Sequence, residues 1–251
     1  MKKTIKHALS VCLVLLSFVL IFTSCGQKDI KPPDSEGLAY SVNEDGISCT
    51  ITGIGNCTDT EVGIPKTIDG YTVTDIISGA FFGCTSLTSI TIPDSVTRIG
   101  GDAFRSCTSL TSITVEGGNP VYHSSGNCVI ETGRKTLVVG CKSSVIPDDG
   151  SVTSISDYAF YECTSLTSIT IPDSVTSIGD YAFSGCTALT SITIPDSVTG
   201  IGGEAFYGCS ALTSINYSGT KDQWNAISKG ELWNNNTGDY VIHCTDGDIS
   251  K

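Results

Sequence analysis

The chain has few basic residues, and this scarcity excludes two kinds of partner. Its 251 residues include 14 Lys and Arg against 26 Asp and Glu, which gives a net charge of −12. A chain this acidic repels the phosphate backbone of nucleic acids, and it offers no polybasic patch to an anionic membrane surface. We therefore expect neither a nucleic-acid partner nor membrane binding through basic side chains.

Groups that carry catalysis or hold metals are also sparse. Beyond His7, the histidines are His123 and His243, and the sequence has neither a Gly-x-Ser-x-Gly nucleophile motif nor a Cys-x-x-Cys pair. On a strand His243 and Cys244 would face opposite sides, and Thr245–Asp248 lacks the full calcium-loop pattern. We therefore expect surface histidines, no metal, no cofactor and no enzymatic activity.

The amino terminus has the pattern of an export signal. Three lysines among the first six residues precede an apolar run from Ala8 to Phe22. This run is shorter than the ~20 apolar residues that span a membrane. We therefore predict that residues 1–24 are a signal peptide. Residues 25–37 are polar and contain two prolines, so we expect a flexible tether there.

The end of this signal resembles the lipobox of bacterial lipoproteins. The stretch is Phe22-Thr23-Ser24-Cys25-Gly26, with Phe22 where Leu is usual. The resemblance implies that Cys25 becomes the mature amino terminus and carries lipid. The lipid would anchor the exported protein at the bacterial cell surface or outer membrane, as its one membrane contact. An ordinary signal peptide that contains a cysteine is the alternative.

A fixed repeat dominates the rest of the chain. Ala-Phe pairs begin at intervals of 23, 56, 23 and 23 residues, and a cysteine three residues after each Phe keeps the same phase. The pairs start at Ala80, Ala103, Ala159, Ala182 and Ala205. A period of 20–29 residues with Leu-x-x-Ile-x-Ile is the signature of leucine-rich repeats. The long interval equals two periods plus ten residues, so we expect one further coil with an insertion inside it.

Each repeat can form one coil of a solenoid. Ile169 and Ile171 alternate with Ser168 and Thr170, as on a strand with one buried face. One unit cannot bury its apolar side chains alone, but units stacked ~4.8 Å apart cover one another. We therefore predict a mainly β fold. It is a leucine-rich-repeat solenoid wound as a right-handed superhelix, with a parallel sheet on the concave face and irregular terminal caps.

The repeat resembles that of the BspA-like leucine-rich-repeat family. The shared pattern is Leu-x-x-Ile-x-Ile-Pro-x-x-Val-x-x-Ile-x-x-x-Ala-Phe-x-x-Cys, and the resemblance runs from about residue 37 to the carboxyl end. It implies an exported bacterial protein that adheres to host matrix proteins, other cells or surfaces. It implies no shared catalytic residues.

The repeat phase divides the chain into segments. We expect the solenoid over residues 38–216. Residues 38–79 would be an atypical amino-terminal cap and first coil, with a hairpin around Asn43–Gly46. The insertion over 116–142 is expected to project as a hairpin from one edge. Residues 217–251, which contain Trp224 and Trp233, are expected to cap the last coil.

The phased aromatic and thiol side chains are expected to form the buried core of the repeats. They are Phe104, Phe160, Phe183, Phe206, Cys107, Cys163, Cys186 and Cys209. Stacked cysteines have parallel Cα–Cβ directions, so we favour a ladder of free thiols over disulfides. In an oxidising location, Cys49 with Cys57 and Cys128 with Cys141 are the disulfide alternatives.

The outward side chains of the long strands are the candidate binding surface. They are Ser89, Thr91, Ser112, Thr114, Ser168, Thr170, Ser191 and Thr193, with Ser214 and Asn216 in the last repeat. Solenoids bind through such extended faces, although Ser and Thr also simply suit exposed strands. The insertion adds the more varied Tyr122, His123 and Arg134 to this candidate surface.

These features together predict a cell-surface, lipid-anchored binding module. We expect adhesion to a protein or glycan ligand, such as host matrix, a glycoprotein or another cell. A structural envelope protein is one alternative, because the coils are so uniform. A substrate-capture component of a surface enzyme system is another.

Overall fold

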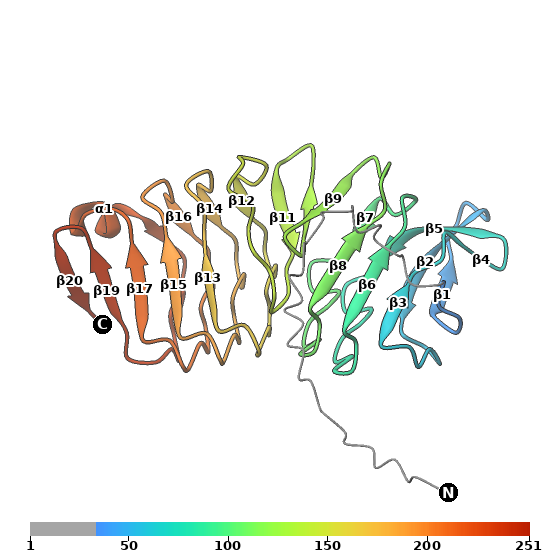
Figure 1. Cartoon of the computed structure of the whole chain (residues 1–251), viewed down its shortest axis with the longest axis horizontal. Helices are drawn as coiled ribbons and strands as arrows, with labels where there is room; N and C mark the ends of the chain where they lie inside the picture. The colour runs from blue at the N-terminus through green and yellow to red at the C-terminus, as the bar shows by residue number, and fades with distance from the viewer. Residues whose placement is uncertain (1–33) are drawn as a thin grey trace, which may run out of the picture. The chain divides into compact units, whose positions relative to one another are not determined.

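Strands stack side by side along the chain (Figure 1), and over residues 154–229 two-residue strands alternate with strands of three or four residues. The structure is a computed structural model, and it describes residues 34–251. Neighbouring strands are mostly parallel and recur from coil to coil, which confirms the predicted mainly β solenoid. The predicted signal peptide, Cys25 and most of the predicted tether lie outside the described residues.

Strands of three or four residues from successive coils form two sheets, which we call the long-strand sheets. The first contains β3 (Glu61–Gly63), β6 (Ser89–Ile92) and β8 (Ser112–Val115), all parallel. The second contains β13 (Ser168–Thr170), β15 (Ser191–Ile194), β17 (Ser214–Tyr217), β19 (Val241–Cys244) and β20 (Gly247–Ser250). Its strands are parallel up to β19, and β20 returns antiparallel. The predicted parallel sheet is therefore interrupted between β8 and β13.

The insertion and the two-residue strands that follow it share a third sheet, which we call the short-strand sheet. Its members are β9 (Tyr122–Ser125), β10 (Cys128–Glu131), β11 (Thr136–Val139), β12 (Ser154–Ile155), β14 (Ser177–Ile178), β16 (Gly200–Ile201) and β18 (Ser228–Lys229). From β11 to β18 each strand is parallel to the next. Since β9 to β11 carry the insertion, the insertion is part of the stack.

The predicted projecting hairpin is therefore wrong in its placement. The side chains of Val129, Ile130 and Leu137 are fully buried. Val129 and Val139 pack in the amino-terminal core, whereas Ile130 and Leu137 pack in the carboxyl-terminal core. Because β10 and β11 each contribute side chains to both cores, the insertion joins the two halves of the solenoid.

The amino-terminal coil begins earlier than expected. The predicted hairpin is present, because β1 (Ala39–Val42) pairs antiparallel with β2 (Ser48–Gly53). The same sheet contains β5 (Tyr71–Ile76), β4 (Thr67–Ile68) and β7 (Arg98–Ile99). Ser35 is buried, and its backbone N–H donates to the Gly63 carbonyl at 2.7 Å. Residues 34–37 therefore belong to the folded unit, which corrects the carboxyl end of the predicted tether.

The Ala-Phe positions build columns of stacked rings. The Phe160 and Phe183 ring centroids lie 5.0 Å apart, and those of Phe183 and Phe206 lie 5.3 Å apart. Phe81 and Phe104 form a separate stack at 5.3 Å. All five side chains are buried. The column breaks between Phe104 and Phe160, where the intervening coil has Gly140 against the Phe160 ring.

The cysteines follow the rings. Cys107, Cys186 and Cys209 are buried, and each thiol lies 3.1–3.2 Å from the carbonyl of a Phe in the preceding coil. Cys163 is only partly buried. It lines a small cavity beside the coil of Gly140, which lacks an Ala-Phe corner and which we call the shortened coil. The ten cysteines of residues 34–251 are free, including Cys49, Cys57, Cys128 and Cys141, so neither alternative disulfide is formed.

The carboxyl-terminal segment covers the last coil. Helix α1 (Lys221–Ala226) starts at a capping box formed by Thr220 and Gln223, which satisfies backbone N–H groups of its first turn. Trp224 is 3% exposed and its ring lies 5.1 Å from that of Tyr217. Trp233 contacts Phe206 edge-on at 6.1 Å. Within residues 34–251, no helix has the length and apolar character needed to cross a membrane.

Candidate binding surface

The second long-strand sheet presents hydroxyl side chains in register. Ser168 pairs with Ser191, and Thr170 pairs with Thr193, across parallel strands. The next strand continues both rows with Ser214 and Asn216. We call the six residues Ser168, Thr170, Ser191, Thr193, Ser214 and Asn216 the hydroxyl ribbon. The isoleucines between them are buried, so the strand alternation holds the ribbon toward solvent.

The first four hydroxyls of the ribbon have no partner in the protein. Within residues 34–251, no hydrogen bond joins the side chains of Ser168, Thr170, Ser191 or Thr193 to another group. Ser168 and Thr170 are also exposed. These hydroxyls can therefore donate to and accept from a ligand without breaking an internal hydrogen bond.

Threonines at other positions of the same coils behave differently. The Thr190 hydroxyl lies 3.1 Å from the Thr167 carbonyl, and the Thr213 hydroxyl lies 3.2 Å from the Thr190 carbonyl. On the short-strand side, the Thr199 hydroxyl lies 3.3 Å from the Thr176 carbonyl. These threonines tie one coil to the previous one, whereas the ribbon threonines do not.

An open groove lies at one end of the hydroxyl ribbon. Its volume is about 740 Å³, and its walls include β13 and the segment from Ser144 to Asp148. β13 is the first strand of its sheet and pairs with β15 on one side. Val145 in the opposite wall is 71% exposed. Sequence reasoning missed this edge, because the coil that contains Val145 was expected to continue the sheet.

A His–Asp pair lies at the other end of the hydroxyl ribbon. His243 pairs with Asn216 across the sheet, and its Nδ1 lies 3.0 Å from Asp248 Oδ1. Asp246 accepts a hydrogen bond from the backbone N–H of Lys221, the first residue of α1, at 2.9 Å. The acidic turn therefore caps a helix and pairs with an imidazole. The antiparallel pairing of β20 with β19 brings these groups together, and no sequence motif predicted this arrangement.

The amino-terminal members of the predicted surface are less accessible. Ser89, Ser112 and Thr114 are partly exposed, and they lie in the separate sheet of β3, β6 and β8. Thr91 lies between Gly63 and Thr114 on the central strand of this sheet. Its side chain is 6% exposed, so Thr91 does not belong to an exposed surface.

The insertion residues do not join the hydroxyl ribbon. Tyr122 is 8% exposed in the amino-terminal core, and burial raises its pKa. Its burial corrects its place in the predicted surface. His123 Nδ1 lies 2.8 Å from the Thr132 hydroxyl, and Arg134 pairs with Glu131 at 3.4 Å. Both lie on the insertion strands of the short-strand sheet or their connecting turn, away from the ribbon.

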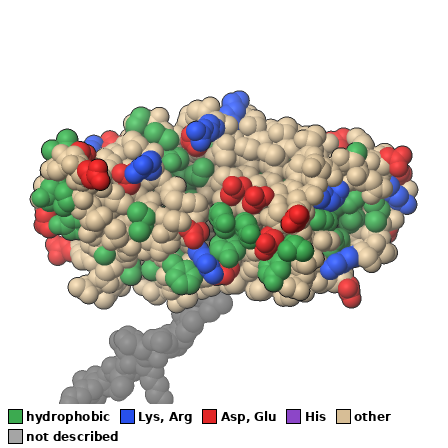
Figure 2. Space-filling model, turned by 180° about the vertical axis from the view of Figure 1, so that it is seen from behind, with side chains coloured by type: hydrophobic (Ala, Val, Ile, Leu, Met, Phe, Trp, Pro, Cys, Tyr) green, Lys and Arg blue, Asp and Glu red, His purple; other side chains and the backbone are tan. Residues whose placement is uncertain are grey.

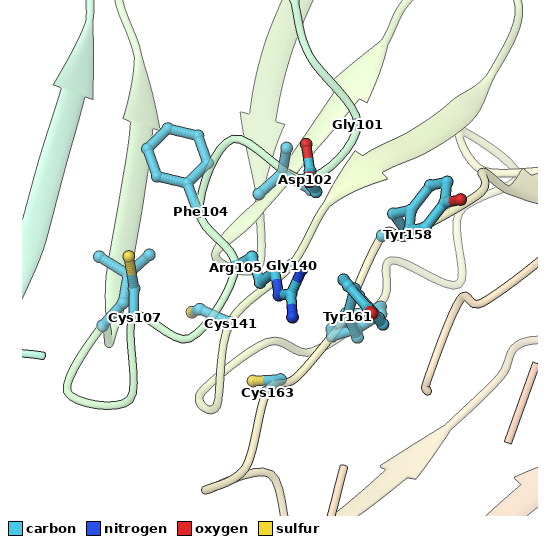
Figure 3. A pocket seen from close by; sticks show the side chains of 14 residues that line it. Gly101, Asp102, Phe104, Arg105, Cys107, Gly140, Cys141, Tyr158, Tyr161 and Cys163 are labelled. Carbon is cyan, nitrogen blue, oxygen red and sulfur yellow. The ribbon is translucent and has the colours of Figure 1, made fainter. Parts of the chain in front are cut away.

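The second notable site is the junction where the ring column breaks (Figure 3). A small cavity of about 20 Å³, large enough for a single water, is lined by Cys107, Cys141 and Cys163 together with Arg105. Burial raises the pKa of Cys107 and of Cys163 to about 12, so these thiols are protonated at neutral pH. Within residues 34–251, no group of three or more His, Cys, Asp or Glu side chains is arranged to hold a metal ion.

Comparison with known proteins identifies the repeats. The family model of the BspA type leucine rich repeat region matches residues 54–128 and 139–244, in six copies. The unmatched stretch between them contains most of β10 and the turn to β11. No curated protein matches the chain.

Solved structures of bacterial repeat proteins are similar to the chain. A leucine-rich repeat protein of T. pallidum shares 26% identity, with 78% of this chain and 79% of that chain covered and a TM-score of 0.38. One from Eubacterium ventriosum shares 25% identity, with 67% and 53% covered and a TM-score of 0.48. A leucine rich cell surface protein from Faecalibacterium prausnitzii shares 20% identity, with 78% and 98% covered and a TM-score of 0.36.

Proposed function

The chain belongs to the BspA-type leucine-rich repeat family, and from this premise we propose that it is a surface-displayed adhesion module. Repeats of this kind form protein-binding modules. We propose a host matrix protein or glycoprotein as the ligand, with the hydroxyl ribbon as the contact surface. The proposed lipid anchor at Cys25 would hold the module at the bacterial cell surface.

One observation carries this proposal. The ribbon hydroxyls of Ser168, Thr170, Ser191 and Thr193 are unpaired within the described chain, whereas Thr190 and Thr213 in the same coils bond back to the preceding coil. If the ribbon residues served only to favour a β-strand, hydroxyls that form hydrogen bonds within the protein would serve equally well. A row of unpaired donors and acceptors next to an open groove supports recognition of an extended polar ligand.

Binding to immobilised matrix proteins and glycoproteins tests the proposal. We expect the full-length protein to bind at least one member of a panel of fibronectin, laminin, collagen and mucin. Replacing Thr170 and Thr193 with Lys should weaken that binding by about tenfold, because two long cations would occupy the ribbon.

The matched control is Thr187→Lys with Ser210→Lys, which adds the same charge at two exposed turn positions whose side chains make no hydrogen bond within residues 34–251. We expect this control to retain affinity within about twofold. Equal losses in both variants, or no binding to any panel member, would contradict the proposed contact surface. Concentration-dependent self-association without ligand would instead support a structural envelope protein.

A further inference from the structure

Aromatic and basic side chains gather where the ring column breaks. The Arg105 guanidinium lies 5.0 Å from the Phe82 ring centroid and 4.7 Å from that of Tyr161. Beside it, the Tyr158 and Tyr181 rings stack at 5.0 Å, and Tyr161 meets Tyr158 edge-on at 5.3 Å. We call these five residues the aromatic corner patch. Figure 3 shows Arg105, Tyr158 and Tyr161 around the junction cavity.

A shortened coil brings these residues together. Phe82, Arg105 and Tyr161 each follow the Phe of an Ala-Phe pair, so they share one repeat position. The coil between Arg105 and Tyr161 has no Ala-Phe corner, and Arg105 reaches across it to Glu162 at 2.6 Å. The insertion thus lets the corners of two non-consecutive repeats touch.

Two residues at this junction have strained backbone conformations that help to hold the coils together. Ser106 and Glu162 have φ of 58° and 51°, at the position that Gly83, Gly185 and Gly208 occupy in other repeats. The Ser106 hydroxyl bonds Glu162, so these two strained residues help to close the junction. Their side chains have an evident structural role.

The residue before the Ala-Phe pair is strained in several repeats, including those of Tyr158 and Tyr181. Their φ values are 60° and 56°, in the left-handed region that costs a non-glycine residue about 1–2 kcal/mol. Gly79 has φ 70° and Glu204 has φ 50° at the same repeat position, so the corner takes this conformation with or without a ring. The Tyr158 and Tyr181 rings stack on each other, and the Tyr181 hydroxyl donates to Glu204 at 2.9 Å, so the corner presents ordered aromatic side chains.

The rim of the aromatic corner patch is acidic. Asp102, Asp157 and Asp180 lie near Tyr158, and their charges add to the burial and the neighbouring Tyr161 that raise the pKa of this phenol. Asp157 and Asp180 each accept a backbone N–H through Oδ1, at 2.8 and 2.7 Å. Within residues 34–251, none of the three carboxylates pairs with a Lys or Arg at ion-pair distance. Figure 2 shows acidic side chains beside hydrophobic ones near the middle of the face opposite that of Figure 1.

We propose that the aromatic corner patch is a second docking site, for a protein partner that inserts a Lys or Arg side chain between the rim carboxylates. Tyr and Arg are enriched among the residues that dominate the binding energy of protein interfaces. The rim supplies charge complementarity to a basic partner. Stacking covers one face of Tyr158 and one of Tyr181, and the Arg105 guanidinium lies over the Tyr161 ring, so a sugar has less aromatic surface to stack on.

A labelled peptide of alternating Arg and Gly is the probe, titrated into the full-length protein at 150 mM salt. Tyr158→Gly with Tyr181→Gly should weaken its binding by about tenfold, because the aromatic contact is lost. The melting temperature should change little, because the relief of left-handed strain by glycine is offset by the loss of ring stacking and of the Tyr181–Glu204 hydrogen bond. Loss of binding without loss of stability separates docking from folding.

Charge is tested with two matched pairs of variants. Asp157→Asn with Asp180→Asn keeps the Oδ1 acceptors and removes two rim charges, so the affinity should fall by about tenfold. Asp196→Asn with Asp239→Asn removes two exposed charges elsewhere and should change affinity by less than about threefold.

Equal losses in the two pairs would overturn the proposal in favour of general attraction to an acidic protein. Binding of a neutral glycan that is lost in the Tyr158→Gly and Tyr181→Gly variant would overturn it in favour of a sugar site. All of these variants leave the hydroxyl ribbon intact. Failure here therefore leaves the adhesion proposal standing, and failure of the matrix panel leaves this one standing.

Discussion

At the residue scale, the cysteines act as small buried hydrophobes with a weak donor. Cys186 is fully buried, and its Sγ lies 3.2 Å from the Phe160 carbonyl. Cys57 lies near Cys84, and Cys141 lies near Cys163, where each contributes to raising its neighbour's pKa after burial. The ladder therefore has two more members than the five Ala-Phe repeats provide, one in the first coil and one in the shortened coil.

Burial of these thiols predicts a loss of stability at alkaline pH. The pKa of Cys107, Cys128, Cys163 and Cys209 is raised to about 12 from an ordinary value of 9.0. Between these values the unfolded chain loses thiol protons that the folded chain retains. The free energy of unfolding should therefore fall as pH rises from 9 to 12, by at most about 1.4 kcal/mol per pH unit for each such thiol.

Chemical denaturation at pH 8, 10 and 11, with a reductant present, measures this slope. The Cys107→Ala and Cys209→Ala double variant removes two of these thiols, so its stability should depend less steeply on pH. An unchanged slope in that variant would show that other groups, such as the buried tyrosines, cause the alkaline loss.

At the element scale, the insertion works as a connector. β10 and β11 each place side chains in both cores, and Gly140 after β11 leaves room for the Phe160 ring. A Cβ on Gly140 would overlap three carbons of that ring. The shortened coil therefore needs glycine here for space, since its φ is not in the left-handed region.

Gly140→Ala tests this packing. The Phe160 ring or the coil must move, so the free energy of unfolding should fall by roughly 1–3 kcal/mol. Gly133→Ala is the matched control in the same insertion, because a Cβ there meets no atom within 4 Å. We expect the control to change stability by about 0.5 kcal/mol or less in equilibrium denaturation. Equal effects of the two substitutions would refute the packing role of Gly140.

At the scale of the whole molecule, the solenoid depends on its carboxyl-terminal cap. β19 pairs with β17, and α1 lays Trp224 over Tyr217. Without these elements, the edge of β17 and the fully buried Phe206 and Ile215 would lose their cover. Exposed strand edges beside apolar side chains promote association between chains.

A chain that ends at Ser218 should therefore self-associate. Light scattering after size-exclusion chromatography measures the mass directly, and we expect oligomers or aggregates at concentrations where the full-length protein has a lower mass. Trp224→Phe in the full chain is the control, because it keeps an aromatic cover and should leave the mass unchanged. If the truncated chain had the same oligomeric state as the full-length protein, the capping role would be contradicted.

The repeat alone was sufficient to predict the solenoid, its parallel strands and the family. A period of 23 residues returns each side chain to the same place in the next coil, so Ile169, Ile192 and Ile215 had to align. The alternation of Ser and Thr with Ile likewise predicted outward hydroxyls on every long strand, and on β13 and β15 they alternate with buried isoleucines. These are local properties, which a sequence pattern expresses directly.

Tertiary structure decided the rest, because the relevant contacts join residues far apart in the chain. Arg105 and Glu162 are 57 positions apart, and they meet because one coil lacks its corner. The burial of Thr91 and Tyr122, the folded position of Ser35 and the break beside β13 likewise depend on how neighbouring coils pack. A repeat pattern states which side chains are equivalent, whereas the places where coils differ are determined by the space that adjoining coils leave.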